Sequence, residues 1–570
     1  MYNALFFSLN SKYTHASLAP WCLLAGVKKY CKSEINVSVA EGTVNEREDA
    51  VLARMAAHKP DFIGFCTYIW NVKAVMSAAE KYKQMYPDTI IVLGGPEVSY
   101  NPEEILSAPY IDYVISGEGE QPCAVLLDSI VRGEDIPVGF GICTMEKISP
   151  PFISCEEPPS PYCDDFFAAL GNRIPYIETS RGCPYSCAFC LSGRCGGVRY
   201  FDMDRVKSEI ILLAQKAAST VKFVDRTFNA HKRRAKEILR FIIENHGAKI
   251  PRGICFHFEI AGDILDDEII DIIRTAPKGL FQFEIGMQSF NEKTLAYIDR
   301  RTDCTLLKNN ILRLTESKSA HIHIDLIAGL PYEDMSSFRD SFNTAFSLRA
   351  DMLQMGFLKL LHGANMRENR EKYPCEFSSE PPYEVTSTPW LTAEDIAVLK
   401  HTEDALDRLC NSGRFRRTAE YIMHRCGKPP FDILRDFGNF AAEHGTSKIT
   451  LDDYTALVLD YFSRRDGIDK AVLRDTMVCD RLSTNSFGKL PPALQISEPV
   501  LTKCAKQYLE SDPNTKQQKG VKRSIAILYS QCHGDNICAV YADYNDSDKN
   551  RHGISAPEYE LRKFYFEYKK

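Results

Sequence analysis

Three cysteines, Cys183, Cys187 and Cys190, stand in one short run with the spacing C-x3-C-x2-C, directly after the β-rich residues 174–179. Cysteine thiolate is the usual ligand of iron–sulfur clusters, so three thiolates this close can bind three irons of a 4Fe–4S cube. The fourth iron then has no protein ligand from this run, and an open position on a metal is where chemistry occurs. The spacing therefore predicts an iron–sulfur site with one iron open to a small molecule.

Zinc and a disulfide are the alternatives for these cysteines. Zinc sites usually combine two C-x2-C pairs, or cysteine with histidine, and no second C-x2-C pair stands at the usual distance. Residues 1–8 lack the basic segment and the apolar core of a signal peptide. The chain is therefore predicted to be cytoplasmic, with reduced thiols. An exposed cluster of this kind also indicates an anaerobic or microaerobic cell.

Length and composition set wide limits. The 570 residues are enough for roughly three or four domains. A hydrophobic content of 44% and a charged content of 25% are ordinary for a globular protein. The net charge of -7 indicates no general affinity for nucleic acid or for an anionic membrane. No apolar run has transmembrane length, so no membrane partner is expected.

Residues 1–140 alternate short β-rich runs with amphipathic stretches, which is typical of a doubly wound parallel sheet. Such sheets bind ligands at the carboxyl ends of their strands. Two glycine-rich loops stand there, Leu93-Gly-Gly-Pro-Glu97 and Gly117-Glu-Gly-Glu120. Glycine lets the backbone approach a bulky ligand closely. A pair of glycines alone would be explained by a structural turn.

Together the two loops resemble the cobalamin-binding domain that precedes the radical domain in cobalamin-dependent radical S-adenosylmethionine enzymes. The resemblance covers nearly all of residues 1–140. It implies bound cobalamin, and it places these loop residues at the cofactor: Gly94, Gly95, Pro96, Glu97, Gly117 and Glu118.

One departure from that family concerns the cobalt ligand. Domains that coordinate cobalt carry D-x-H-x-x-G after the first strand, whereas this chain has Tyr13-x-His15-x-x-Leu18. We expect His15 to bond backbone or the periphery of the cofactor, and the lower face of cobalt to be open or occupied by water. Tyr68 and Trp70 follow the third strand and would face the corrin, with core packing as their alternative role.

The middle of the chain predicts six strand–helix units, typical of an open barrel smaller than the full eight. The predicted strands are residues 174–179, 221–225, 254–260, 281–286, 321–327 and 352–357. Function in such barrels lies at the carboxyl ends of the strands. The polar residues found there are Asp225, Glu259, Glu284, Gln288, Ser289, Asp325 and Lys359. Asn229 is the predicted cap of a basic helix over residues 231–245.

Several strings in this region resemble motifs of the radical S-adenosylmethionine barrel, among them Phe283-Glu-Ile-Gly-Met-Gln-Ser-Phe290 and Asp325-Leu-Ile-Ala-Gly-Leu-Pro331. The resemblance implies that Glu259, Glu284 and Gln288 face S-adenosylmethionine. It also implies that the turn at Gly329 packs near the adenine. Carboxylates suit a ligand that carries an ammonium and a sulfonium. Salt bridges at the mouth of the barrel are the alternative role for each carboxylate.

The implied chemistry is reductive cleavage of S-adenosylmethionine to a 5′-deoxyadenosyl radical, followed by methyl transfer from methylcobalamin to an unactivated carbon of an unknown substrate. An electron donor such as flavodoxin or ferredoxin would be needed. A cobalamin-assisted rearrangement or cyclisation without methyl transfer is the second hypothesis. A non-catalytic cobalamin or iron–sulfur sensor or carrier is the third, and the complete cysteine triad argues against it.

The expected fold class is α/β. A doubly wound Rossmann-like domain (1–140) and a linker (141–170) precede a partial (β/α)6 TIM-like barrel (171–365). A mainly helical domain (366–570) follows and ends in a β-hairpin around Gly534 and Asp535. Its scattered cysteines lack cluster spacing, so single structural cysteines are favoured over an auxiliary cluster. The basic, aromatic tail 562–570 is compatible with RNA, but a solvated amphipathic end is favoured.

Overall fold

The computed structural model describes residues 2–445, 448–485, 489–496, 498–513, 515, 517, 520–544 and 558–568. Compactness divides the chain into two units. The first consists of residues 1–333 and 357–392, and the second of residues 334–356 and 393–570. In the part of the chain that is described, no helix is long and apolar enough to cross a membrane.

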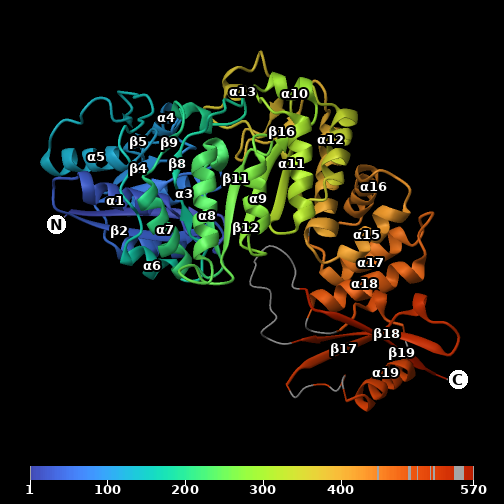
Figure 1. Ribbon diagram of the computed structural model, residues 1–570. Helices are drawn as coiled ribbons and strands as arrows, with labels where there is room; N and C mark the ends of the chain where they lie inside the picture. The colour runs from blue at the N-terminus through green and yellow to red at the C-terminus, as the bar shows by residue number, and fades with distance from the viewer. Residues whose placement is uncertain are drawn as a thin grey trace. The chain divides into compact units, whose positions relative to one another are not determined.

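The N-terminal sheet has the strand order β2-β1-β3-β4-β5-β6, in which only β6 pairs antiparallel (Figure 1). Chain order reverses between β1 and β3, the point where open α/β sheets bind ligands. The strands are β1 (Tyr2–Asn10), β2 (Ile35–Thr43), β3 (Phe62–Cys66), β4 (Ile90–Gly94), β5 (Tyr113–Ile115) and β6 (Ile142–Cys143). The helices are α1 (Ala19–Tyr30), α2 (Glu48–Ala57), α3 (Val72–Met85), α4 (Pro102–Leu106) and α5 (Glu120–Arg132).

Two apolar cores, one on each face, hold this sheet between helices. Side chains of α2 and α3, such as Met55 and Tyr82, pack with Leu5 and Ile63 of the sheet. In the core on the opposite face, helices α1 and α5 pack against the intervening strand residues, such as Phe6 of β1. Successive strand residues therefore belong to opposite cores, as expected for a parallel sheet covered on both faces. The predicted doubly wound fold is confirmed.

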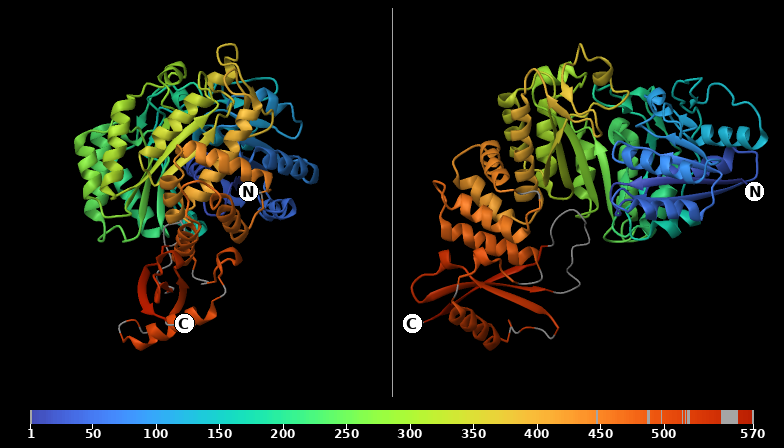
Figure 2. Two further views of the ribbon diagram at one scale, coloured as in Figure 1. Left: turned by 90° about the vertical axis from the view of Figure 1, so that its right-hand side faces the viewer. Right: turned by 180° about the vertical axis from the view of Figure 1, so that it is seen from behind.

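The barrel sheet contains β7 (Tyr176–Ile177), β10 (Thr220–Phe223), β11 (Cys255–Ile260), β12 (Phe281–Gln288) and β13 (His321–Ala328), in that spatial order. The sixth predicted strand forms as β14 (Met352–Phe357). Helices α8, α9 and α11 lie along one side of the sheet (Figure 1), and the view from behind shows its strands without these helices in front (Figure 2). The helices here are α6 (Asp164–Leu170), α7 (Met203–Lys216), α8 (Lys232–Asn245), α9 (Asp267–Thr275), α10 (Glu292–Tyr297), α11 (Cys304–Ser317), α12 (Met335–Ser347) and α13 (Asn365–Glu368).

The predicted cap of α8 is wrong. His231 is the N-cap residue, and its Nδ1 accepts a hydrogen bond from the Arg234 amide. Asn229 is instead buried in the preceding turn. Its side chain donates to the Ala261 carbonyl and accepts from the Ala261 amide, at 2.7 and 2.9 Å. Asn229 therefore joins the ends of two strands, a long-range role that local capping rules do not reveal.

Two small sheets complete the first unit. The pair β8 (Ser180–Arg181) and β9 (Arg199–Tyr200) is antiparallel and encloses the cysteine run. The pair β15 (Glu376–Phe377) and β16 (Val385–Ser387) is also antiparallel. Short 3-10 turns occur at η1 (Ser192–Cys195) and η2 (Phe228–Ala230).

The second unit is helical and ends in a three-stranded antiparallel sheet, β17-β18-β19. The hairpin β17–β18 is confirmed, and the tail, predicted as a solvated amphipathic end, is amphipathic and mostly exposed. It forms β19, because Phe564 and Phe566 pack into a small core with Leu501; residues 569 and 570 lie outside the described residues. The elements are α14 (Ala393–Ala405), η3 (Leu406–Asn411), α15 (Arg416–Arg425), α16 (Pro430–Glu443), α17 (Leu451–Phe462), α18 (Lys470–Thr484), η4 (Pro492–Leu494), α19 (Pro499–Ser511), β17 (Lys522–Ile527), η5 (Tyr529–Gln531), β18 (Asn536–Tyr544) and β19 (Leu561–Glu567).

Candidate cofactor site

A cavity of about 1060 Å³ opens at the carboxyl ends of both parallel sheets of the first unit. The loops after β1, β3, β4 and β5 line one side, and residues of the barrel strands line the other. The cavity brings together these sequence-predicted residues: His15, Tyr68, Trp70, Gly94, Gly95, Pro96, Gly117, Glu118 and Glu259. Glu97, Glu284, Gln288 and Gly329 are not among its lining residues.

Glycine stands at these loop positions for different structural reasons. Gly95 has φ +120°, and a Cβ there would lie 2.4 Å from the Thr67 carbonyl oxygen. Gly117 has φ +89°, and its Cβ would lie 2.2 Å from the Phe152 carbonyl oxygen. Both are therefore required by close approach of backbone. A Cβ at Gly94 would meet only Ile115, at 3.6 Å, so this glycine is the one whose side-chain space faces the cavity.

His15 is held by the start of the barrel. Its Nδ1 shares a hydrogen bond with the Tyr176 hydroxyl, at 2.7 Å. Residues beside it exchange backbone bonds with Ile174: the Ala16 amide donates to the Ile174 carbonyl and the Ile174 amide to the Thr14 carbonyl. Burial lowers the pKa of His15, which favours the neutral imidazole. Tyr13 is 76% exposed and gives His15 no support.

Tyr68 and Trp70 stack on each other, with ring centroids 4.3 Å apart and planes 7° apart. Asn71 fixes their loop. Its side-chain oxygen accepts from the Tyr68 amide, and its side-chain nitrogen donates to the carbonyls of Leu9 and Cys66. Because Trp70 remains 50% exposed, the stack presents a flat apolar surface to the cavity rather than filling the core.

The three predicted cluster ligands lie in the loop between β8 and β9, and each sulfur has a polar neighbour. Arg300 Nη1 donates to Cys187 Sγ at 3.6 Å, and the Ser192 amide donates to Cys190 Sγ at 3.4 Å. Cys183 Sγ lies 3.4 Å from the Thr227 hydroxyl. Burial raises the pKa of Cys187, and the Arg300 guanidinium opposes that shift.

These surroundings fit a cubane cluster, because hydrogen bonds to sulfur are one of the means by which proteins tune such clusters. No three His, Cys, Asp or Glu side chains within the described ranges converge as they would on a single metal ion. Each cysteine of a cubane binds a different iron, so the thiols need not converge on one point. Cys195, which sequence reasoning missed, lies in the same loop and lines the cavity.

The barrel strands β11 to β13 separate apolar from polar residues by alternation. Phe256, Phe258, Phe281 and Phe283 are fully buried core residues. The alternate positions are polar: His257, Glu259, Gln282, Glu284, His321, His323 and Asp325. Since neighbouring residues of a strand point to opposite faces, the polar set shares one face of the sheet. The alternation is visible in the sequence, although sequence reasoning considered only the strand ends.

Glu284 forms its closest contacts within this polar face. His257 Nε2 donates to its carboxylate at 3.1 Å, and Lys222 Nζ lies at 3.7 Å. The hydrogen bond from His257, aided by the charge of Lys222, lowers the pKa of Glu284 to about 2. Burial lowers the pKa of His257, so a neutral imidazole donates to an ionised carboxylate.

The remaining carboxyls of the polar face are driven toward the neutral form. Burial raises the pKa of Glu259, which lies opposite Glu284 in the β11–β12 register. Burial, together with the charges of Glu284 and Glu259, raises the pKa of Asp325 to about 8. Asp325 Oδ1 is buried and has no hydrogen-bond partner among the described residues. Asp325 therefore presents a buried polar atom that a ligand could engage.

Two predicted residues stand at irregular backbone positions. Gln288 has φ +70° and sits where the β12–β13 register shifts. Gly329 has φ +92°, and a Cβ there would lie 2.6 Å from Val385 Cγ1. Gln288 is the last residue of β12 and Gly329 directly follows β13, so both lie at the carboxyl ends of barrel strands, where ligand-binding residues of this architecture lie.

Comparison with known proteins bears on this geometry. Residues 14–127 match the model of the B12 binding domain, and residues 177–345 match the radical SAM superfamily. The cobalamin-dependent radical SAM methyltransferase TokK of Streptomyces tokunonensis is 27% identical over 402 residues, 65% of this chain and 57% of TokK. The chain therefore contains a B12 binding domain followed by a radical SAM domain.

A second relative is a 2-(S-pantetheinyl)-carbapenam-3-carboxylate methyltransferase of Streptantibioticus cattleyicolor. It is 28% identical over 307 residues, 50% of this chain and 44% of its own length. The chain thus spans about half the length of the curated relatives it matches. Among solved structures, the cobalamin-dependent S-adenosylmethionine radical enzyme OxsB has a TM-score of 0.56 at 13% identity, covering 90% of this chain and 81% of OxsB.

The C-terminal part has a match of its own. Residues 371–540 match a protein family of unknown function, DUF4080. This match begins within the first unit and continues into the second.

Glu97, which the family resemblance placed at cobalamin, forms a buried contact elsewhere. Its carboxylate accepts a hydrogen bond of 2.5 Å from the Tyr383 hydroxyl, and burial raises its pKa. Glu97 is only 4% exposed. It joins the loop after β4 to the segment before β16.

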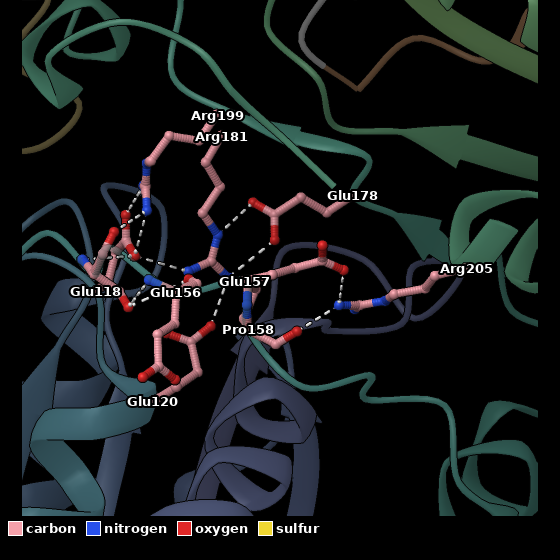
Figure 3. A network of polar contacts seen from close by, with 10 residues as sticks. Glu118, Glu120, Glu156, Glu157, Pro158, Glu178, Arg181, Arg199 and Arg205 are labelled. Atoms are coloured by element: carbon pink, nitrogen blue, oxygen red, sulfur yellow. Dashed lines mark hydrogen bonds and ion pairs between the residues drawn. The ribbon is translucent and has the colours of Figure 1, made fainter. Parts of the chain in front are cut away.

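Glu118 lines the cavity, but its carboxylate is engaged by two arginines that sequence reasoning missed. Arg181 Nη1 contacts it at 3.2 Å, and Arg199 Nη2 pairs with its second oxygen. Figure 3 shows the resulting network, in which Arg181 also contacts Glu120 and Glu178. Arg181 could have been identified in the sequence by its position two residues before Cys183.

Proposed function

We propose that the chain is a cobalamin-dependent radical S-adenosylmethionine methyltransferase that methylates an unactivated carbon of a small molecule. The observation that carries the proposal is the shared cavity. It is lined by the loops of the B12-binding domain, by Glu259 and Lys222 of the barrel, and by Leu191, Ser192, Arg194 and Cys195 of the cysteine loop. One space of about 1060 Å³ is thus accessible from both cofactor modules.

When bound, the cluster, S-adenosylmethionine and cobalamin supply radical formation and a transferable methyl group, while the protein orients and shields them. Cys183, Cys187 and Cys190 would hold the cluster. Glu259 and Gln288 would bind S-adenosylmethionine, with the turn at Gly329 near the adenine. The domain limits predicted from the sequence, 1–140, 171–365 and 366–570, belong to this proposal.

The cobalamin residues have distinct proposed roles. Gly94, Gly95, Pro96 and Gly117 would give the corrin room at the loops, and the Tyr68–Trp70 stack would pack against it. His15 would stay bonded to Tyr176 and would not serve as a cobalt ligand. The support for this is the 2.7 Å contact of His15 Nδ1 with the Tyr176 hydroxyl.

Anaerobic reconstitution tests the proposal. Protein loaded with cluster and hydroxocobalamin is given dithionite as the electron source and S-adenosylmethionine, and 5′-deoxyadenosine is measured. We expect 5′-deoxyadenosine to form. Its absence with both cofactors loaded would contradict radical chemistry and favour a sensor or carrier.

A methyl-deuterated S-adenosylmethionine then separates methyl transfer from rearrangement. Candidate small molecules are incubated with the reconstituted protein, and products are analysed by mass spectrometry. Product that carries the deuterated methyl group supports the methyltransferase. Product formed without label indicates a rearrangement or cyclisation instead.

A further inference from the structure

The loop that carries the three cysteines is closed at its base by a pair of arginines. Arg181 in β8 and Arg199 in β9 are register partners across the antiparallel pair. Like charges placed directly opposite each other destabilise a strand pair. The base of the loop therefore requires carboxylates to neutralise it.

Those carboxylates come from the cavity loop of the B12-binding domain. Glu118 pairs with both arginines through its two oxygens, and Glu120 Oε1 lies 2.5 Å from Arg181 Nη2. A third carboxylate, Glu178, lies 2.9 Å from Arg181 Nε and belongs to the barrel side. The side chains of Arg181, Glu118 and Glu120 are 13%, 14% and 9% exposed, so solvent screens these pairs little.

The carboxylate side of the network is itself fixed in place. Glu120 is the first residue of α5, and a Cβ at Gly26 of α1 would lie 2.6 Å from its carbonyl oxygen. The Glu118 amide donates to the Phe152 carbonyl at 2.9 Å. The segment 117–120 also lines the cavity. Movement of the arginines would therefore displace a wall of the cavity rather than a free loop.

We infer that Arg181 is a positioning residue that couples the cysteine loop to the cobalamin loop, so that loading the cluster increases the affinity for cobalamin. The inference rests on the proposed function. A cluster bound to Cys183 two residues away fixes the backbone that carries Arg181. The fork of Arg181 in turn fixes Glu118 and Glu120, and a preorganised site binds its ligand more tightly.

A second buried arginine provides a matched control. Arg173 donates to both oxygens of Glu41 at 2.8 and 3.1 Å, and these side chains are 10% and 7% exposed. This pair also joins the N-terminal sheet to the segment before β7. Neither Arg173 nor Glu41 lines the cavity, and Arg173 lies outside the β8–β9 loop.

The experiment measures the Kd for hydroxocobalamin in full-length protein with the cluster reconstituted and with iron removed by a chelator. Wild type, Arg181→Gln, Arg181→Lys and Arg173→Gln are compared, and thermal unfolding confirms that each variant is folded. We expect the cluster to tighten cobalamin binding at least about fivefold in wild type and in Arg173→Gln. The ratio should fall to about one in Arg181→Gln, with partial recovery in Arg181→Lys, which keeps the charge but loses the fork.

Three results would overturn the inference. The cluster could leave the Kd for cobalamin unchanged in wild type, or it could tighten binding in Arg181→Gln as much as in wild type. The effect of the cluster could also be lost equally in Arg173→Gln, which would indicate general docking of the domains. A wild-type chain that binds no cobalamin in either state contradicts the proposed function itself, and the inference with it. The two failures are therefore distinguishable.

Discussion

The two parallel sheets of the first unit meet at one cavity but contribute to it differently. In the N-terminal sheet, the central strand β3 is buried at every position, because helices cover both faces. That sheet offers the cavity its loops and the apolar carboxyl ends of its strands, such as Phe65 and Ile115. Strands β11 to β13 bury phenylalanines and aliphatic residues in one core and carry His257, Glu259, Glu284 and Asp325 on the other face.

The difference indicates a division of labour. A site built from loops binds a large cofactor through shape and backbone, so its glycines matter most. A site built on a strand face holds titratable side chains rigidly, which suits chemistry. Changes in the first sheet should therefore alter affinity or stability, whereas changes on the polar face should alter ionisation.

Cys187→Ala is expected to have the largest effect. Removal of one thiolate should abolish formation of 5′-deoxyadenosine and the brown chromophore of the cluster. Cobalamin should still bind, with the affinity of cluster-free wild type, because no residue of the N-terminal loops is changed. Absorbance spectra and product analysis check both points, and loss of cobalamin binding would show that the two sites are not separable.

A pair of adjacent glycines tests the loop site. Gly95→Ala should lower the free energy of unfolding by about 2–3 kcal/mol, because its φ of +120° disfavours a side chain and Thr67 leaves no room. Gly94→Ala should fold normally but weaken cobalamin binding about tenfold by overpacking the cavity. Urea unfolding and cobalamin titration distinguish the two. Equal stability of both variants would contradict the assigned roles.

The dependence of stability on pH tests whether the polar face holds His323 in its neutral form. Burial and then the charges of His321 and His257 lower its pKa to about 3, while Glu284 and Lys222 also face it. The folded state therefore binds fewer protons than the unfolded state, whose histidine has the ordinary value of about 6.5. The contribution of neutral His323 to the free energy of unfolding is therefore present above the unfolded-state pKa and is lost as the pH falls below it.

Between pH 7 and pH 5 this one group should cost about 2 kcal/mol. Urea unfolding at both pH values should show that wild type loses about that much more than His323→Gln, which cannot titrate. An identical loss in the two proteins would mean that His323 is not held neutral by the fold.

Tyr383→Phe should have a smaller effect. The buried Glu97 carboxyl loses its 2.5 Å hydrogen bond, and unfolding free energy should fall by about 1–2 kcal/mol. Cobalamin affinity should not change, because Glu97 lies outside the lining of the cavity. Glu97→Gln, which retains an acceptor for Tyr383, is the control and should be affected less.

His15→Gln is expected to have the smallest effect. The electron paramagnetic resonance spectrum of bound cob(II)alamin should lack nitrogen splitting from a protein ligand in both wild type and variant. Affinity should change by no more than about twofold, since His15 contributes only at the periphery. Nitrogen splitting that disappears in the variant would identify His15 as a cobalt ligand.

Much of the fold was predictable because its signals are local. Strand β14 forms over residues 352–357, as the sequence indicates, and β17 and β18 form the hairpin predicted around Gly534 and Asp535. Asn229 was mispredicted because its partner, Ala261, is distant in the sequence. The strand in the tail was not predicted for the same reason, since β19 exists by pairing with β18.

The sequence by itself determined the chemistry that is available: three closely spaced cysteines, two glycine loops after strands and polar residues on barrel strands. Tertiary structure decided which of these meet. It placed Glu118 on two arginines, Glu97 on Tyr383 and Glu284 on His257, and it left Asp325 Oδ1 without a partner among the described residues. Such contacts depend on burial and on strand register across long separations, which no local pattern of residues encodes.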